Sequence, residues 1–275
     1  MSEATLTRGQ GNLDCVVIRN HRARGVLYLQ GAHVTEYQPI DSPPVLFVSN
    51  ASQYRLGSPI RGGVPICFPW FADKQDEPSA PAHGLARLQR WELDPTSSTD
   101  ALRLTTQIDL FELRLEALFD TKLSMALTVI NQSPNNVRFE AALHTYLQIG
   151  DIRRIHIHGL EQIGYFDKVA GNAAPASGQP IHFNSEVDRV YTGTTDTCVL
   201  HDPDLKRRIF VEKRGSQSTI IWNPWITKAK HMTDFGDNEW SQMCCIETAN
   251  VDSDAVRLAP GAHHTLTAHI RVDPI

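Results

Sequence analysis

Three stretches of the sequence alternate between apolar and polar residues, and this alternation constrains the fold more than any other feature. It runs through residues 111–116, 122–130 and 265–272. In the second stretch, every second position holds a leucine, methionine or valine. Successive side chains of a β-strand leave opposite faces of the sheet, so a two-residue period predicts strands with one buried face. The chain is therefore expected to form antiparallel sheets that each cover a core.

Many shorter segments also have strand character. We expect strands at 15–19, 25–30, 45–49, 102–109, 137–149, 154–158, 187–192, 208–213, 218–222 and 243–247. Turn-forming clusters at 131–136 and 171–180 separate some of them. Helical periodicity is nearly absent, so we expect only a helical turn at 236–242 and a loop at 165–185. Many short strands with turns between them predict an all-β sandwich or barrel, with residues 1–275 as a single domain.

Composition excludes several classes of protein. The formal net charge is −5 without a long run of like charge, so nucleic-acid binding, which needs a basic surface, is not expected. No apolar stretch reaches the roughly 18 residues that span a membrane. The N-terminus lacks the apolar centre of a signal peptide. The five cysteines are odd in number and form no C-x-x-C pair, which predicts free thiols and a cytoplasmic location.

The predicted strand 137–149 carries an unusual set of side chains on one face. His144, Tyr146 and Gln148 alternate there with mainly apolar residues. Such a polar and aromatic face suits a sugar-binding groove, where hydroxyls need hydrogen bonds and ring faces need apolar contact. It also suits an ordinary solvent-facing side of an antiparallel sheet, and the pattern by itself favours this second interpretation.

Two further segments place arginines near glycines. The segment 61–72 (RGGVPICFPWFA) begins with Arg61, and the segment 81–93 contains His83 and Arg87. Two arginines in one cleft would bind a phosphate through charge-assisted hydrogen bonds. The first segment is equally compatible with a rigid crossover that closes one end of a sandwich. The second is compatible with a loop histidine and a surface arginine.

Glu247 follows the apolar residues 243–246, where burial is expected to end. A carboxylate there is either a strand-end charge in water or a base in a partly desolvated pocket. His156 and His158 would share a strand face, but zinc needs three or four ligands and the spacing offers no third. We therefore expect no metal. The absence of G-x-S-x-G and P-loop patterns removes the common nucleophile and nucleotide motifs, and we expect no cofactor.

In order along the chain, a set of motifs resembles the glucose-6-phosphate 1-epimerase family, within the galactose-mutarotase-like superfamily. The motifs are GAHVTEYQP at 31–39, RGGVPICFPWF at 61–71, HGLAR at 83–87, LHTYL at 143–147, VDRVYTG at 187–193, TIIWNPW at 219–225, CCIETANV at 244–251 and LAPGAHHTL at 258–266. The ordered set is specific and outweighs the non-functional interpretations of the separate segments. The resemblance implies an antiparallel β-supersandwich with few short helices and a concave active-site face.

The resemblance also implies an activity, which is mutarotation of a hexose 6-phosphate. By the match of LHTYL and CCIETANV, His144 corresponds to a general acid and Glu247 to a general base. An aldose changes anomer when its ring opens and closes, which needs one proton removed and one added. The partner implied is a small sugar phosphate, and we expect a monomer.

The same resemblance implies the substrate contacts. Arg61 and Arg87 correspond to phosphate ligands, Asp188 to a ligand for sugar hydroxyls, and His83 to a further active-site histidine. One position departs from the pattern: relatives can carry a glutamine before HGLAR, whereas this chain has Ala82. Ala82 has no polar side-chain group, so this chain lacks the contact with substrate that the glutamine would make.

Two other functions remain open at this stage. A non-catalytic carbohydrate-binding domain would use Trp70, Trp222 and Trp225 as stacking surfaces without an acid and a base in register. An aldose 1-epimerase acting on free sugars would have no need of Arg61 and Arg87.

Overall fold

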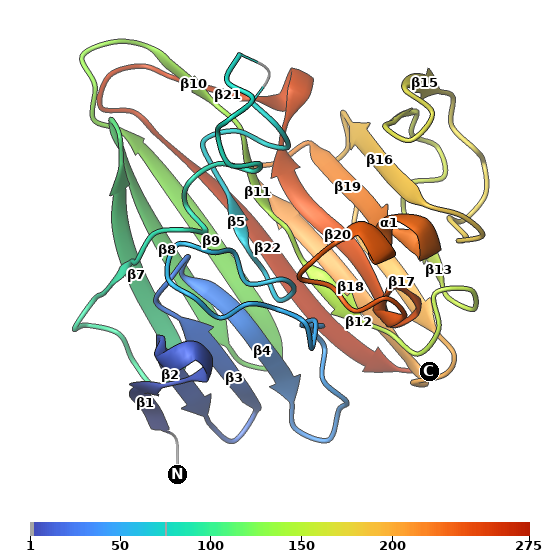
Figure 1. The fold of residues 1–275 in the computed structure, drawn as a ribbon, viewed down its shortest axis with the longest axis horizontal. Helices are drawn as coiled ribbons and strands as arrows, with labels where there is room; N and C mark the ends of the chain where they lie inside the picture. The colour runs from blue at the N-terminus through green and yellow to red at the C-terminus, as the bar shows by residue number, and fades with distance from the viewer. Residues whose placement is uncertain (1–2, 75) are drawn as a thin grey trace.

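Antiparallel pairing of short strands builds most of the molecule (Figure 1). The computed structural model describes residues 3–74 and 76–275. An N-terminal sheet contains, in order, β1 (Glu3–Arg8), β2 (Asp14–Arg19), β3 (Ala23–Tyr28) and β4 (His33–Pro39). A small ribbon pairs β10 (Val137–Phe139) with β21 (Val256–Leu258).

Two eight-stranded sheets form the body. The first, the central sheet, has the order β15 (Asn172–Ala174), β14 (Tyr165–Asp167), β16 (Val187–Thr192), β19 (Ser218–Asn223), β20 (Met243–Asn250), β11 (Ala141–Leu143) and β5 (Ile66–Cys67), with β12 (Tyr146–Gln148) also paired to β20. The second, the outer sheet, has the order β13 (His156–His158), β17 (Cys198–Asp202), β18 (Arg207–Arg214), β22 (His263–Pro274), β9 (Lys122–Asn131), β8 (Phe111–Phe119), β7 (Ala101–Ile108) and β6 (Glu92–Leu93).

The outer sheet confirms the alternation of the sequence. Along β9, the buried residues are the leucines, methionine and valine of every second position and the final Asn131, and the residues between them are half-buried. Along β22, Leu266, Ala268 and Ile270 are buried in the same way. Both strands contribute to one continuous core with β19 and β20 of the central sheet. The expected all-β antiparallel fold is therefore confirmed.

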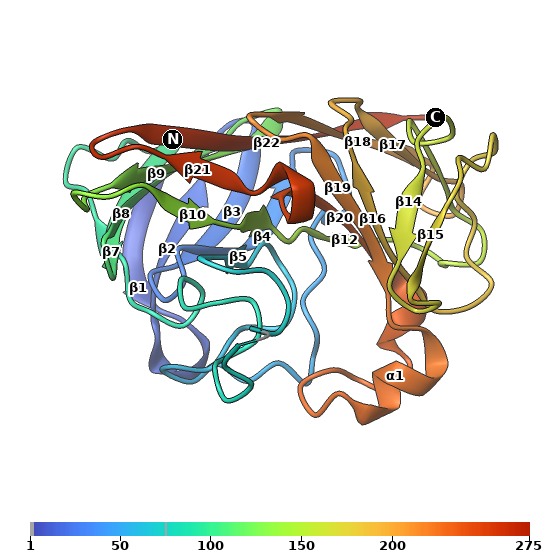
Figure 2. The ribbon, with the colours of Figure 1, turned by 90° about the horizontal axis from the view of Figure 1, so that it is seen from above.

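The central sheet is different, because β19 and β20 are buried at every residue. A strand buried on both faces must be covered on both sides. Figure 2 shows loops before and after β5, within residues 40–65 and 76–90, and helix α1 (Trp225–His231) on the same side of this sheet, away from β22. From the sequence, burial is expected to end at Glu247. This expectation is wrong, because β20 continues to Asn250 and is buried along its whole length.

Several local predictions were wrong. The segment 137–149 is not one strand but three short ones, β10, β11 and β12. Residues 45–49 make only isolated bridges to Leu147 and Gly62. Helix α1 was not predicted, and neither were the strands β1, β4, β5, β6, β14, β15, β17 and β21. The helical turn expected at 236–242 is the 3-10 turn η2 (Glu239–Gln242). Two further 3-10 turns are η1 (Gln10–Asn12) and η3 (Asp252–Asp254).

The helices and the cysteines each have one further property. Within residues 3–74 and 76–275, none of the helices has the length and apolar character needed to cross a membrane. All five cysteines are buried free thiols.

Candidate active site

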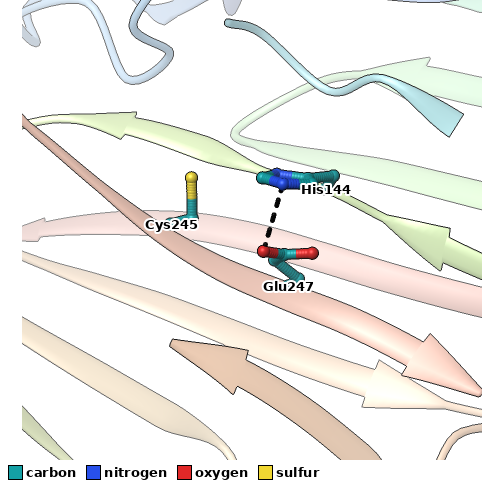
Figure 3. Close-up of side chains that lie close together, drawn as sticks. All are labelled: His144, Cys245 and Glu247. Atoms are coloured by element: carbon teal, nitrogen blue, oxygen red, sulfur yellow. Dashed lines mark ion pairs between the residues drawn. The ribbon is translucent and has the colours of Figure 1, made fainter. Parts of the chain in front are cut away.

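The register of the central sheet brings a histidine and a glutamate together. β11 pairs with 248–250 of β20, and β12 pairs with 243–245. The two pairings share one register, so His144, which lies between the two short strands, is opposite Glu247. Figure 3 shows the two side chains pointing toward each other, with His144 Nε2 3.3 Å from Glu247 Oε1. An imidazole and a carboxylate in contact are able to act as an acid–base pair.

This pair is removed from water. His144 is 6% exposed and Glu247 is 1% exposed. Burial raises the pKa of Glu247 well above its usual value, and the charge of Asp188 adds to the effect. Burial lowers the pKa of His144 well below its usual value, and the neighbouring His83 and Arg87 add to that effect. Both directions favour the neutral forms.

Each member of the pair also keeps one polar atom free. His144 Nδ1 and Glu247 Oε2 are buried and have no hydrogen-bond partner among the described residues. Buried polar atoms are usually hydrogen-bonded, and exceptions occur at catalytic sites. The pair therefore contains two buried polar atoms that the described residues leave unsatisfied.

Aromatic rings hold His144 in place. The Tyr146 ring stacks on the imidazole, with ring centroids 4.8 Å apart and planes 13° apart. Trp222 and His83 meet the imidazole edge-on, with centroids at 6.0 and 5.5 Å. The expectation of a solvent-facing strand side is thus wrong for His144 and Tyr146, which are both buried.

Arg61 lies beside this cluster and is itself held by two partners. Its Nη1 donates to the Tyr146 hydroxyl at 3.1 Å. Its Nε and Nη2 lie 3.2 and 3.1 Å from Asp234 Oδ2. A guanidinium has five N–H donors, so these three contacts leave two of them for an anion.

The loop carrying His83 depends on unusual backbone conformations. His83 and the following Gly84 have φ of 61° and 75°. A Cβ on Gly84 would collide with the Phe68 carbonyl group, so only glycine fits there. His83 Nδ1 accepts from the Ala72 N–H at 3.3 Å, which leaves Nε2 as the protonated nitrogen of the neutral ring. Burial, followed by the charge of Arg87, lowers the pKa of His83.

Asp188 reaches the site from β16, two strands away from Glu247. It lies opposite Trp222 in the β16–β19 pairing. Burial raises its pKa, whereas Lys168 and Lys228 oppose the rise. Lys228 Nζ lies 4.0 Å from Asp188 Oδ2. The positive charges of these two lysines therefore partly offset the negative charge of Asp188. Neither lysine was singled out from the sequence.

These groups surround one cavity of about 260 Å³. Its lining residues are Arg61, Phe71, Ala72, His83, His144, Tyr146, Lys168, Asp188, Ile220, Trp222, Lys228, Met232 and Glu247. The cavity offers carboxylates, imidazoles and cations around aromatic surfaces. This composition suits a small polar molecule with a negative group.

Comparison with known proteins identifies the family. The family model described as "Aldose 1-epimerase" matches residues 14–271. The chain belongs to the aldose 1-epimerase family. It is 31% identical over 281 residues to a Cenchrus ciliaris protein named "Putative glucose-6-phosphate 1-epimerase", a match that covers 94% of this chain and 84% of that one. An Escherichia coli K12 protein of the same name is 30% identical over 246 residues, covering 86% and 83% of the two chains.

Solved structures of similar proteins have the same fold. The crystal structure of "a putative mutarotase (YeaD)" from Salmonella typhimurium superposes with a TM-score of 0.87. The match is 24% identical and covers 99% of this chain and 97% of that one. This likeness confirms the galactose-mutarotase-like architecture expected from the sequence motifs, and the family is one of epimerases.

Five of the six residues singled out from the sequence line this cavity. The sixth, Arg87, is buried but is not among the lining residues. Its Nη2 donates to the Ala82 carbonyl at 2.6 Å, and its Nε has no partner among the described residues. Sequence reasoning missed Lys168, Lys228 and Asp234, because isolated charged residues in loops and in a short helix carry no pattern.

A thiol also lies close to the His144–Glu247 pair. Ligand atoms of His144, Cys245 and Glu247 all lie within 4.8 Å of one another (Figure 3). Cys245 and Glu247 are two residues apart on β20 and so share a face of the sheet. Burial, followed by the charge of Glu247, raises the pKa of Cys245 well above its usual value. The thiol therefore stays protonated beside the pair.

Proposed function

We propose that this epimerase interconverts the α and β anomers of a hexose 6-phosphate, with glucose 6-phosphate as the expected substrate. The observation that carries the proposal is the buried His144–Glu247 pair, 3.3 Å apart, in the same cavity as Arg61. Ring opening removes a proton from the C1 hydroxyl and adds one to the ring oxygen. Both oxygens are bonded to C1, so the acid and the base must be close neighbours.

In the proposed reaction Glu247 takes the C1 hydroxyl proton and His144 gives a proton to the ring oxygen. The bond between C1 and the ring oxygen breaks and an open-chain aldehyde forms. Rotation about C1–C2 presents either face of the aldehyde carbon, and the reverse transfers close the ring to either anomer. Atoms and protons balance without a further reactant.

His144 and Glu247 together hold one transferable proton throughout this cycle, in addition to the N–H that a neutral imidazole keeps. The proton is on His144 before ring opening and on Glu247 after it. Burial raises the pKa of Glu247 and lowers that of His144, so the site stabilises the proton distribution that accompanies the open-chain form. General acid–base catalysis of this kind typically contributes about 10²–10⁴-fold in rate.

Phosphate binding is proposed for the two arginines. Arg61 keeps two N–H donors after its contacts with Asp234 and Tyr146, and an arginine fork suits a phosphate. Arg87 lies behind the cavity wall, so its part in binding requires that it exchange the Ala82 carbonyl for a phosphate oxygen. Held at the 6-phosphate, the sugar keeps C1 beside the catalytic pair.

Hydroxyl recognition is proposed for Asp188 and His83. Asp188 lies in the cavity with partial compensation by Lys228, so it is able to accept hydrogen bonds from sugar hydroxyls. His83 offers Nε2 as a donor, since its Nδ1 already accepts from Ala72. Lys168, which also lines the cavity, adds a positive charge close to both carboxylates.

Anomer exchange measured by saturation-transfer NMR tests the proposal. Glucose 6-phosphate and free glucose are compared side by side. Acceleration of the phosphosugar alone supports the reaction and the role of the arginines. Equal acceleration of both sugars would instead indicate a free-aldose epimerase, and acceleration of neither would indicate a binding domain.

Two variants separate chemistry from binding. His144→Ala is expected to remove most of the rate for every sugar, because the acid is lost. Arg87→Ala is expected to raise KM for glucose 6-phosphate much more than for glucose. Equal effects of Arg87→Ala on the two sugars would contradict a phosphate role for this residue.

A further inference from the structure

Four histidines gather on the exposed face of the outer sheet, at the edge formed by β13. His156 and His158 point outward from β13, because Ile157 between them is fully buried. His201 pairs with His156 from the neighbouring strand β17. His182 belongs to the segment that bridges the other side of β13. Three segments far apart in the sequence thus bring four imidazoles to one place.

The ring of His156 lies close to each of the other three rings. The His156 centroid lies 4.7 Å from that of His201, 5.0 Å from that of His158 and 5.5 Å from that of His182. Two imidazoles bound to one tetrahedral zinc ion, with Zn–N of about 2.0–2.1 Å, have centroids about 5 Å apart. The His156 and His201 rings stack, so binding requires a turn about χ2, which is a broad and soft torsion in histidine.

One histidine of the cluster has a carboxylate partner of the kind that metal-binding histidines commonly have. His158 Nδ1 lies 2.8 Å from Glu161 Oε1, and the other oxygen of Glu161 accepts from the Gly159 N–H at 2.8 Å. A ligating histidine commonly donates its second ring nitrogen to a carboxylate in this manner, which leaves Nε2 for the metal. His201 Nδ1 is buried and has no hydrogen-bond partner among the described residues.

The cluster is separate from the proposed acid–base chemistry, because none of its four histidines lines the cavity that holds His144 and Glu247.

We propose that this histidine cluster (His156, His158, His182 and His201) binds one divalent transition-metal ion of the class that prefers imidazole, such as Zn²⁺, with His156 as the central ligand. Imidazole ligands suit Zn²⁺, Cu²⁺ and Ni²⁺ rather than Mg²⁺ or Ca²⁺. A bound ion would join β13 to its neighbours and stabilise the edge of the outer sheet, because it binds the folded chain preferentially.

Calorimetric titration of the full-length chain with ZnCl₂ and with MgCl₂, without an affinity tag, tests the proposal. We expect one Zn²⁺ per chain, no response to Mg²⁺, and a rise in Tm that grows with Zn²⁺ concentration. Glu161→Gln should lower the affinity about 10- to 100-fold, and His156→Ala should lower it further. His263→Ala, at an exposed histidine elsewhere on the outer sheet, is the matched control and should bind like wild type.

A second control addresses the catalytic cavity. His144, Cys245 and Glu247 are the three-ligand set already close together, so Cys245→Ser should leave Zn²⁺ binding unchanged if the ion sits at the histidine cluster. Loss of binding in Cys245→Ser, wild-type affinity in His156→Ala, or no Zn²⁺ binding by the wild type would each overturn the proposal. Circular dichroism confirms that each variant is folded.

Discussion

Replacing Glu247 with glutamine separates the effect of this residue on the rate of catalysis from its effect on the stability of the fold. Glutamine keeps the shape of the side chain but does not titrate. Because general acid–base catalysis supplies about 10²–10⁴-fold, kcat for glucose 6-phosphate should fall by that factor, which corresponds to about 2.7–5.4 kcal/mol. KM should change much less, because Arg61 and Asp188 remain in the cavity.

The same substitution should change how stability depends on pH. The pKa of Glu247 is raised in the folded chain relative to an unfolded value of about 4.3. Its favourable contribution is present below the unfolded pKa and is lost as the pH rises through the folded pKa. Each unit of the rise costs the wild type about 1.4 kcal/mol at pH values above both. Glu247→Gln lacks this loss, so its stability relative to wild type should increase from acid to alkaline pH.

Two measurements check this reasoning. NMR exchange gives kcat, and urea unfolding at several pH values between 4.5 and 9 gives the difference in free energy of unfolding. Glu116→Gln, on the exposed face of β8, is the control and should change neither quantity. A fall in kcat of less than tenfold would refute the base assignment. Parallel stability curves for wild type and Glu247→Gln would refute the raised pKa.

Three further predictions follow from the site. Arg61→Ala should lower kcat/KM for glucose 6-phosphate about 10- to 100-fold, the worth of a charge-assisted hydrogen bond, with a smaller effect on free glucose in the same assay. The alkaline limb of the pH–rate profile marks loss of the one proton that the His144–Glu247 pair needs, so it should follow the pKa of Glu247. Asp188→Asn removes a charge that raises this pKa and should move the limb to lower pH, whereas Lys168→Met removes a charge that lowers it and should move the limb to higher pH. Shifts of the two variants in the same direction would contradict this. Gly84→Ala should lower the stability by at least about 1 kcal/mol in denaturant unfolding, because φ is 75° and a Cβ would collide with a backbone carbonyl.

Strand prediction succeeded where burial on one face is enough to define the pattern. β8, β9 and β22 have one face toward the core and one toward solvent, so their sequences alternate. It failed at 45–49, which has strand-like residues but makes only isolated bridges. It also failed at 137–149, where the backbone leaves the ladder around His144. There the His144 N–H donates to the Pro65 carbonyl at 3.0 Å, a contact that local pattern does not encode.

The environment of the His144–Glu247 pair was the largest difference between expectation and structure. From local sequence, His144 read as part of a wet strand face and Glu247 as a strand-end charge. Both are buried, because loops within residues 40–65 and 76–90 and helix α1 cover that side of the central sheet. Covering elements lie far away in the chain, so burial of this kind cannot be inferred from the strand that becomes buried.

The sequence by itself determined the antiparallel all-β class, through its two-residue period, and the residue types of the site, through its ordered motifs. Tertiary structure alone decided that His144 lies opposite Glu247, that Lys168 and Lys228 face the same cavity, and that His201 joins His156 at the sheet edge. The physical reason is common to all three. Periodicity reports which face of a strand is apolar, whereas strand register and loop packing depend on contacts between segments that are distant in the chain.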